Sequence, residues 1–159
     1  MSLRIGVVSD THGRLHERVL ELFAGVDRIL HAGDVGSEDV LGHLDAVAPV
    51  SAVRGNMDHY AGAGRLPEEL RLEIEGLAVV VVHDGARWLR SHDPVAEAVD
   101  VLVTGHTHRP VVESFDGYLH LNPGSASRAG AGGTRTVALL EVGDGRPEAR
   151  ILPLGAEQI

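Results

Sequence analysis

Apolar runs alternate with amphipathic stretches over the first third of the chain. Three short runs rich in Val, Ile and Leu have the pattern of strands that are buried on both faces: residues 3–9, 28–31 and 50–53. Two stretches between them, residues 15–23 and 37–47, place apolar side chains at helical spacing, with Ser37 at the position expected of a helix N-cap. This β-α-β-α-β order predicts parallel strands joined by helical crossovers.

Strand patterns dominate the remainder of the chain. Apolar and charged residues alternate over residues 70–74, whereas residues 77–82 and 101–104 are continuous apolar runs. Two hairpins are indicated further on, around Asp116-Gly117 (between segments 111–115 and 118–121) and around residues 143–145 (between segments 134–142 and 148–152). The whole pattern predicts a mixed α/β fold in which two sheets pack together, with helices outside.

The length and composition are those of one globular domain. The chain has 159 residues, of which 43% are hydrophobic and only 3% aromatic, so the core is expected to consist mainly of Val, Leu, Ile and Ala. Residues 61–69 and 124–133 are rich in small side chains and lack periodicity, but neither has the character of a domain linker. There is no internal repeat, and we expect a single domain over residues 1–159.

Cysteine is missing from the sequence, which excludes a disulfide framework, a zinc-thiolate site and a cysteine nucleophile. Residues 1–10 contain no charged leader followed by a long apolar stretch, so they are interpreted as a first strand rather than a signal peptide. No apolar run approaches the ~18 residues that indicate a membrane span. The expectation is a cytoplasmic protein without a membrane partner.

The charge of the chain argues against one class of partner and for one class of cofactor. The formal net charge is −9 and lysine does not occur, which disfavours sequence-independent binding of nucleic acid. An acidic enzyme that acts on an anionic substrate needs a local source of positive charge, and bound metal ions provide one. The chain also contains ten histidines, which are common metal ligands.

Polar side chains follow the predicted strands at the point where each one ends. The residues concerned are Asp10, His12, Asp34, Asn56, His83, His106 and His108. Because binding sites in α/β sheets lie outside the carboxyl ends of the strands, we expect these side chains to converge. Carboxylate, amide and imidazole groups suit divalent ions such as Mn, Fe, Ni or Zn. The sequence therefore predicts a metal site at this edge of the sheets.

The same residues carry a resemblance to a known family. The ordered motifs are Asp10-x-His12, Gly33-Asp34, Gly55-Asn56-x-Asp58, His83 and Gly105-His106-x-His108, followed by Asn122-Pro123-Gly124-Ser125. Together they resemble the calcineurin-like metallophosphoesterases, and most of all their small, single-domain phosphodiesterase branch. The resemblance runs from about residue 5 to residue 125. A single motif of this kind arises by chance, whereas five in order at strand ends do not.

The resemblance implies a four-layer αββα fold without a cap domain, and it implies two divalent ions, with Mn favoured and Ni, Fe, Zn or Co as alternatives. One ion would be held by Asp10, His12 and His108, and the other by Asn56, His83 and His106. Asp34 would bridge the two ions, which lie roughly 3.5–4 Å apart in such sites. In this family a metal-bridging hydroxide attacks phosphorus in line, which makes Asp34, Asn56 and His106 the predicted catalytic residues and a small phosphodiester the predicted substrate.

Two positions depart from the family pattern. Met57 stands where many members have a histidine that is proposed to protonate the leaving group, and methionine donates no proton. The small phosphodiester-cleaving branch often lacks that histidine as well. The branch usually follows its Asn-Pro-Gly-Ser turn with Pro-Arg, whereas Arg128 of this chain is preceded by Ser127.

Several alternatives remain open on the sequence alone. One alternative to the phosphodiesterase is a phosphomonoesterase. Another is a non-catalytic, protein-binding scaffold that resembles the retromer subunit of this fold. That subunit lacks the histidine of the first motif, which is present here as His12. His31 supports a ligand or packs at a strand end, His59 is a displaced acid or a solvated residue, and Arg54 and Arg109 contact phosphate or nearby carboxylates. Relatives form homo-dimers or tetramers, and the sequence does not choose between them.

Overall fold

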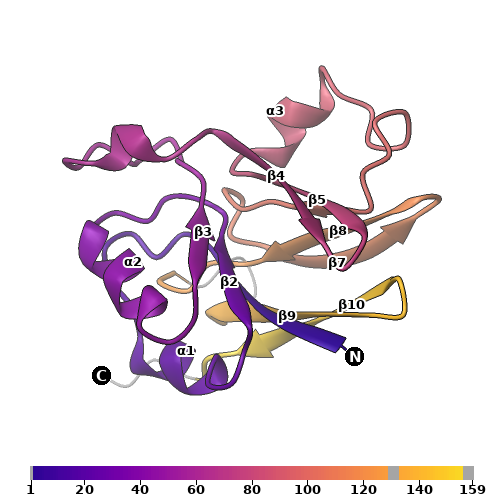
Figure 1. The fold of residues 1–159 in the computed structure, drawn as a ribbon. Helices are drawn as coiled ribbons and strands as arrows, with labels where there is room; N and C mark the ends of the chain where they lie inside the picture. Colours follow the sequence, from indigo (N-terminus) through magenta and orange to yellow (C-terminus); the bar gives the residue numbers. More distant parts are fainter. Residues whose placement is uncertain (1, 129–132, 156–159) are drawn as a thin grey trace.

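The computed structural model describes residues 2–128 and 133–155, and its strands form two five-stranded sheets (Figure 1). The first sheet has the order β10-β9-β1-β2-β3, with β1 Ser2–Val8, β2 Arg28–His31, β3 Val50–Ala52, β9 Thr136–Gly143 and β10 Arg146–Pro153. The second has the order β4-β5-β6-β8-β7, with β4 Glu69–Ile74, β5 Leu77–Val82, β6 Val101–Val103, β7 Pro110–Phe115 and β8 Tyr118–Pro123. The predicted two-sheet α/β class is confirmed.

Parallel pairing in both sheets directs several strand ends toward one edge. β1, β2 and β3 are parallel, and helices α1 (Glu17–Leu22) and α2 (Glu38–Asp45) make the crossovers between them. β5, β6 and β8 of the second sheet are also parallel. Ser37 caps α2 as predicted, because its hydroxyl accepts a hydrogen bond from the Asp39 amide.

Both predicted hairpins are present, each with a two-residue turn. Phe115 pairs with Tyr118 across Asp116-Gly117, and Gly143 pairs with Arg146 across Asp144-Gly145. Gly117, Asp144 and Gly145 adopt positive φ, the conformation that tight hairpin turns require. The second hairpin is longer than predicted, since β9 runs on to Gly143 and β10 begins at Arg146.

Three apolar clusters hold the sheets and helices together as layers. The largest lies between the sheets and joins Val7 and Leu30 of the first sheet to Val79, Val81 and Val103 of the second. A second cluster packs α1 and α2 against the outer face of the first sheet. The third packs helix α3 (Gly85–Leu89), through Trp88, against Val80, Val82 and Leu102 on the outer face of the second sheet. Helices therefore cover both outer faces.

The structure differs from the sequence prediction at some element ends. The first helix begins at Glu17 rather than residue 15, because the His16 side chain accepts a hydrogen bond from the Arg18 amide and acts as the N-cap. Residues 63–65, in the segment predicted as a loop, form a short 3-10 helix, and β4 begins at Glu69. None of the helices in the described parts of the chain is long and apolar enough to cross a membrane.

Candidate metal centre

The seven predicted donors follow strands of both sheets. Asp10 and His12 come after β1, Asp34 after β2 and Asn56 after β3, whereas His83 follows β5, and His106 and His108 follow β6. Within the described residues, two groups of three side chains place one ligand atom each within 4.8 Å of the others. These groups are Asp10, His12 and His108, and Asp10, Asp34 and His83. The ends of β1, β2, β5 and β6 therefore bring together five of the seven predicted donors, namely Asp10, His12, Asp34, His83 and His108.

Asp10 is the centre of the first group. Its Oδ1 atom lies 3.3 Å from Nε2 of His108 and 3.8 Å from Nε2 of His12, and the two imidazole nitrogens are 3.5 Å apart. Ligands that bind one ion at 2.0–2.2 Å are about 3 Å from one another, so these separations suit a shared ion. This group draws on the first sheet for Asp10 and His12 and on the second for His108.

His83 is the centre of the second group. Its Nε2 atom lies 3.2 Å from Oδ2 of Asp34, 3.0 Å from Oδ1 of Asn56 and 3.9 Å from Oδ1 of Asp10. Its other nitrogen, Nδ1, lies 2.8 Å from the carbonyl oxygen of Ala32 and donates to it. A histidine held in this way presents Nε2 to the site in a fixed orientation, which is the usual support of a metal-binding histidine.

Five of the seven predicted donors have a left-handed backbone conformation. Their φ angles are 55° for Asp10, 49° for His12, 54° for Asp34, 72° for His106 and 63° for His108. Such angles are uncommon for residues other than glycine and cost of order 1–3 kcal/mol each. Strain of this kind persists where the surrounding structure enforces it, and it clusters at functional sites.

Oδ1 of Asp10 is buried and has no hydrogen-bond partner among the described residues. The other carboxylate oxygen, Oδ2, accepts hydrogen bonds from the Ser9 hydroxyl and from the His106 amide. A buried acceptor without a partner is costly, and Oδ1 faces the imidazole nitrogens of His12, His83 and His108. A bound divalent cation would satisfy this atom, so the donor set fits the metal that the resemblance implies.

Burial, hydrogen bonds and neighbouring charges shift the pKa values of three of the predicted donors. Burial raises the pKa of Asp10, against the opposing effect of the Ser9 hydroxyl. Burial acts in the same direction on Asp34, but hydrogen bonds from His83 and the Met57 amide outweigh it and lower the pKa of Asp34 to about 2. Burial lowers the pKa of His83, whereas Asp34 and Asp10 raise it, and the net shift is upward. Positive charge at Nε2 of His83, from a proton or a cation, is thus favoured.

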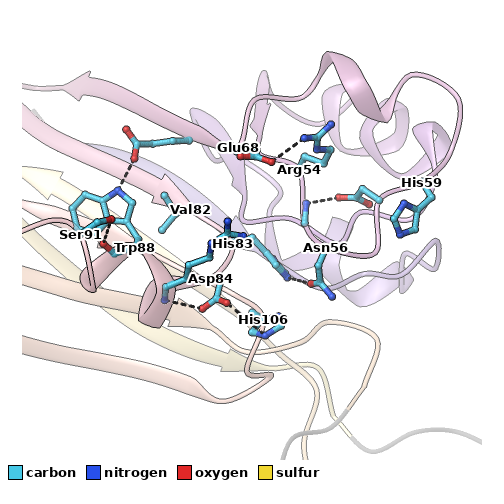
Figure 2. A pocket seen from close by; sticks show the side chains of 14 residues that line it. Arg54, Asn56, His59, Glu68, Val82, His83, Asp84, Trp88, Ser91 and His106 are labelled. Atoms are coloured by element: carbon cyan, nitrogen blue, oxygen red, sulfur yellow. Dashed lines mark hydrogen bonds and ion pairs between the residues drawn. The ribbon is translucent and has the colours of Figure 1, made fainter.

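His106 lies at the rim rather than in either group. Its ring is edge-on to His83, with centroids 5.1 Å apart, and its Nε2 atom faces Oδ2 of Asp84 at 3.9 Å (Figure 2). Asp84 also caps α3 by accepting a hydrogen bond from the Arg87 amide. This contact was not predicted, because the turn that positions Asp84 as the cap of α3 leaves no periodic pattern in the sequence.

A cleft of about 590 Å³ opens beside the second group. Asn56, His83 and His106 line the part of the cleft nearest the donors, and Trp88 and Ser91 line another part (Figure 2). Arg87 of α3 lines it as well. Further lining side chains are Arg54, His59, Glu68, Glu69 and Asp84. The volume suits a ligand of small-molecule size.

The remaining residues of interest have defined contacts. Arg54 is paired with Glu68 at 2.9 Å, which agrees with the carboxylate alternative. Asp58 accepts hydrogen bonds from the amides of Gly36 and Gly55 and so braces the Asn56 turn. Trp88 is buried on the outer face of the second sheet, donates to Glu69 and stacks on His92, and it also lines the cleft.

His31 lies at the end of β2 and bonds residues that neighbour the predicted donors. It is fully buried, its Nε2 atom lies 3.0 Å from the Thr11 hydroxyl, and its Nδ1 atom accepts from the Gly33 amide. It contacts the residues next to the predicted donors rather than the donors themselves.

Comparison with known proteins identifies the family. Residues 3–145 match the calcineurin-like phosphoesterase superfamily domain. A probable metallophosphoesterase of Methanothermobacter thermautotrophicus is 38% identical over 131 residues, which cover 76% of each chain. The phosphodiesterase YfcE of Escherichia coli is 32% identical over 162 residues, covering 87% of this chain and 88% of the relative. The chain therefore belongs to the calcineurin-like phosphoesterase superfamily, as its motifs predict.

Two solved structures have the same fold. A structure described as a novel archaeal phosphodiesterase superposes with a TM-score of 0.79 at 25% identity, over 94% of this chain and 100% of that one. A single mutant of Vps29 from Entamoeba histolytica superposes with a TM-score of 0.72 at 22% identity, over 95% of this chain and 99% of that one. The likeness to Vps29 concerns the fold alone.

Proposed function

We propose that this protein is a phosphodiesterase that hydrolyses a small phosphodiester with the help of two divalent metal ions. The observation that carries the proposal is the buried Oδ1 atom of Asp10, which has no hydrogen-bond partner in the described residues and faces three imidazole nitrogens. Membership of the calcineurin-like phosphoesterases and the likeness to phosphodiesterase YfcE support the reaction type.

The donors divide between two ions. Asp10, His12 and His108 would hold one ion, Asn56, His83 and His106 would hold the other, and Asp34 would serve both. When bound, a pair of divalent ions acidifies water and neutralises charge on the phosphoryl oxygens. Mn is the favoured metal on the family resemblance, and Ni, Fe, Zn or Co are compatible with the same donor types.

The chain's own groups hold these donors in place. The Met57 amide donates to Oδ1 of Asp34 at 2.8 Å and leaves Oδ2 directed toward His83. The Ala32 carbonyl holds the His83 ring by its Nδ1 proton. The substrate occupies the cleft beside Asn56 and His106, where Arg87 offers a guanidinium group to an anionic ligand. Arg54 also lines the cleft, but it is paired with Glu68.

The decisive experiment combines metal analysis with turnover. We expect two metal ions per chain after loading with Mn, and hydrolysis of bis(p-nitrophenyl) phosphate. Asp34→Asn removes one carboxylate oxygen from the shared position and is expected to lose both properties, whereas Asp116→Asn, in the hairpin turn at the opposite end of β8, serves as the matched control. Full turnover by Asp34→Asn, or by the chelated wild-type protein, contradicts the proposal.

The same assay separates the two alternatives. A phosphomonoesterase would cleave p-nitrophenyl phosphate faster than the diester. A protein-binding scaffold would bind metal stoichiometrically without hydrolysing any ester. We retain this alternative because the chain shares its fold with Vps29. The presence of His12, which the retromer subunit of this fold lacks, favours the enzyme.

A further inference from the structure

We propose that the turn at residues 122–127 is a brace that fixes the position of Asp10 relative to His108, and thereby sets the affinity of one of the two metal ions. The inference rests on the proposed metal site. Asn122, Ser125 and Ser127 are positioning residues in this proposal, because each acts on the backbone or neighbour of a donor and not on the metal.

Two hydroxyls of the turn bind the same backbone atom of Asp10. The Ser125 hydroxyl donates to the Asp10 carbonyl oxygen at 2.9 Å, and the Ser127 hydroxyl donates to it at 2.7 Å. These contacts join residues that are 115 and 117 positions apart in the sequence. Asp10 has a φ of 55°, an unfavourable conformation that must be enforced by its surroundings. The paired hydroxyls supply part of that enforcement.

The start of the turn holds the loop that carries His106 and His108. Nδ2 of Asn122 donates to the Gly105 carbonyl oxygen at 3.0 Å and to the Thr107 hydroxyl at 3.2 Å. Its Oδ1 atom accepts from the Gly124 amide at 2.9 Å, which fixes the amide plane and closes the turn. One turn therefore contacts both loops that contribute to the Asp10, His12 and His108 group.

The brace is itself anchored in the core. Asn122 and Ser125 are only 2% and 1% exposed, and the Ala126 amide donates to the Ser9 carbonyl oxygen. The Thr136 hydroxyl donates to the Pro123 carbonyl oxygen at 2.6 Å. Gly124 has a φ of 76°, and a Cβ atom placed on it would clash with the Thr136 hydroxyl. A rigid turn with such fixed contacts can transmit position to a ligand loop.

The contacts are directed at one group of donors more than the other. The Ser125 and Ser127 hydroxyls hold the backbone of Asp10, which is assigned to the first ion, whereas Asp34 and His83 are held by the Met57 amide and the Ala32 carbonyl. Loss of the brace should therefore weaken the ion bound by Asp10, His12 and His108 more than the ion bound near His83.

The test measures Mn binding by titration calorimetry on the full chain. The variant Ser125→Ala/Ser127→Ala removes both hydroxyls, Ser127→Thr restores one as a conservative variant, and Ser114→Ala on exposed β7 is the control. We expect one of the two dissociation constants to rise by about 10- to 100-fold in the double variant, as is typical for loss of supporting contacts. The other constant should change less than about 3-fold, and Ser127→Thr on the Ser125→Ala background should recover part of the loss.

The outcomes are distinguishable. Two unchanged dissociation constants, or equal weakening of both ions, overturn the brace. Absence of Mn binding by the wild-type protein instead overturns the proposed function, and the brace with it. If the double variant does not fold in EDTA by circular dichroism, Ser127→Ala alone, at a half-buried position, carries the same test with a smaller expected rise.

Discussion

The imidazole of His31 and the hydroxyl of Thr11 are joined inside the core, with Nε2 and Oγ1 3.0 Å apart. The Gly33 amide donates to Nδ1 of His31, so Nε2 carries the proton that is donated to Thr11. The Thr11 hydroxyl donates in turn to the Val35 carbonyl oxygen at 2.8 Å. This series of bonds requires a neutral imidazole, and it ties the segment after β1 to the segment after β2.

The first prediction concerns acid stability. Burial, followed by the charge of His83, lowers the pKa of His31 from 6.5 to about 3. Between these pH values the unfolded chain binds a proton that the folded chain does not, so stability falls as pH falls. From pH 7 to pH 5 this one group should cost about 2 kcal/mol.

Urea unfolding of the metal-free protein at the two pH values measures this effect. The variant His31→Gln lacks the titrating group, so its free energy of unfolding should fall by about 2 kcal/mol less than that of the wild-type protein over the same interval. An equal fall in the free energy of unfolding for the wild-type protein and for His31→Gln contradicts the prediction.

The second prediction concerns Gly55, which packs against Asp34. A Cβ atom on Gly55 would clash with Oδ1 and with the backbone nitrogen of Asp34, and a backbone atom cannot yield easily. Gly55→Ala should displace the Asp34 carboxylate and lower Mn affinity by about 10- to 100-fold, without changing any ligand. Gly64→Ala is the matched control, because a Cβ atom there meets nothing within 4 Å. Calorimetric titration compares the two, and equal affinities would refute the clash.

The third prediction concerns the leaving group. Met57 cannot donate a proton, and general-acid help is typically worth about 10²- to 10⁴-fold. The protein should therefore hydrolyse nitrophenyl diesters much faster than alkyl diesters, since an alkoxide needs protonation to leave. The Met57 side chain is 57% exposed, so Met57→His should fold and narrow the gap. Met57→Gln is the control, and equal wild-type rates on the two substrates contradict the prediction.

The fourth prediction concerns the rim of the cleft. Arg54 is held by Glu68, whose side chain is 78% exposed, and an exposed pair of this kind contributes less than about 1 kcal/mol. Glu68→Gln should free Arg54 for an anionic substrate and lower KM by about 2- to 5-fold, with kcat and stability nearly unchanged. Glu73→Gln, exposed on β4, should have no effect on steady-state kinetics. An unchanged KM for Glu68→Gln means that Arg54 does not reach the substrate.

Much of the fold was predictable because buried parallel strands leave a simple pattern. Each apolar run ends at a polar residue, and the strand ends meet at one edge, so Asp10, Asp34 and His83 could be placed together from the sequence. The two-residue hairpin at Asp116-Gly117 was equally clear, since that dipeptide tolerates positive φ.

Other features depend on tertiary structure and leave no local signal. Helix α3 is only five residues long and buries just Gly85 and Trp88, which is too little for helical periodicity to be detected. The left-handed backbone of the donors is imposed by contacts such as those of Ser125 and Ser127 with Asp10. The edge-on placement of the His106 ring against His83 depends on the fold of its loop, which spacing alone does not predict.

Two hairpin turns lie at the opposite end of the sheets from the loops that carry the predicted metal donors. Ser2 of β1 pairs with Gly143 beside one hairpin turn, and Tyr118 begins β8 beside the other. The far end of β1 leads to Asp10, and the far end of β8 carries Asn122, which bonds the loop of His106 and His108. Both hairpin tips lie at the right in Figure 1, away from the loops that follow β2 and β3. Exposed turns of this kind accept insertions most readily. A peptide tag or a second module grafted between Asp116 and Gly117 would therefore extend the protein without reaching its chemistry.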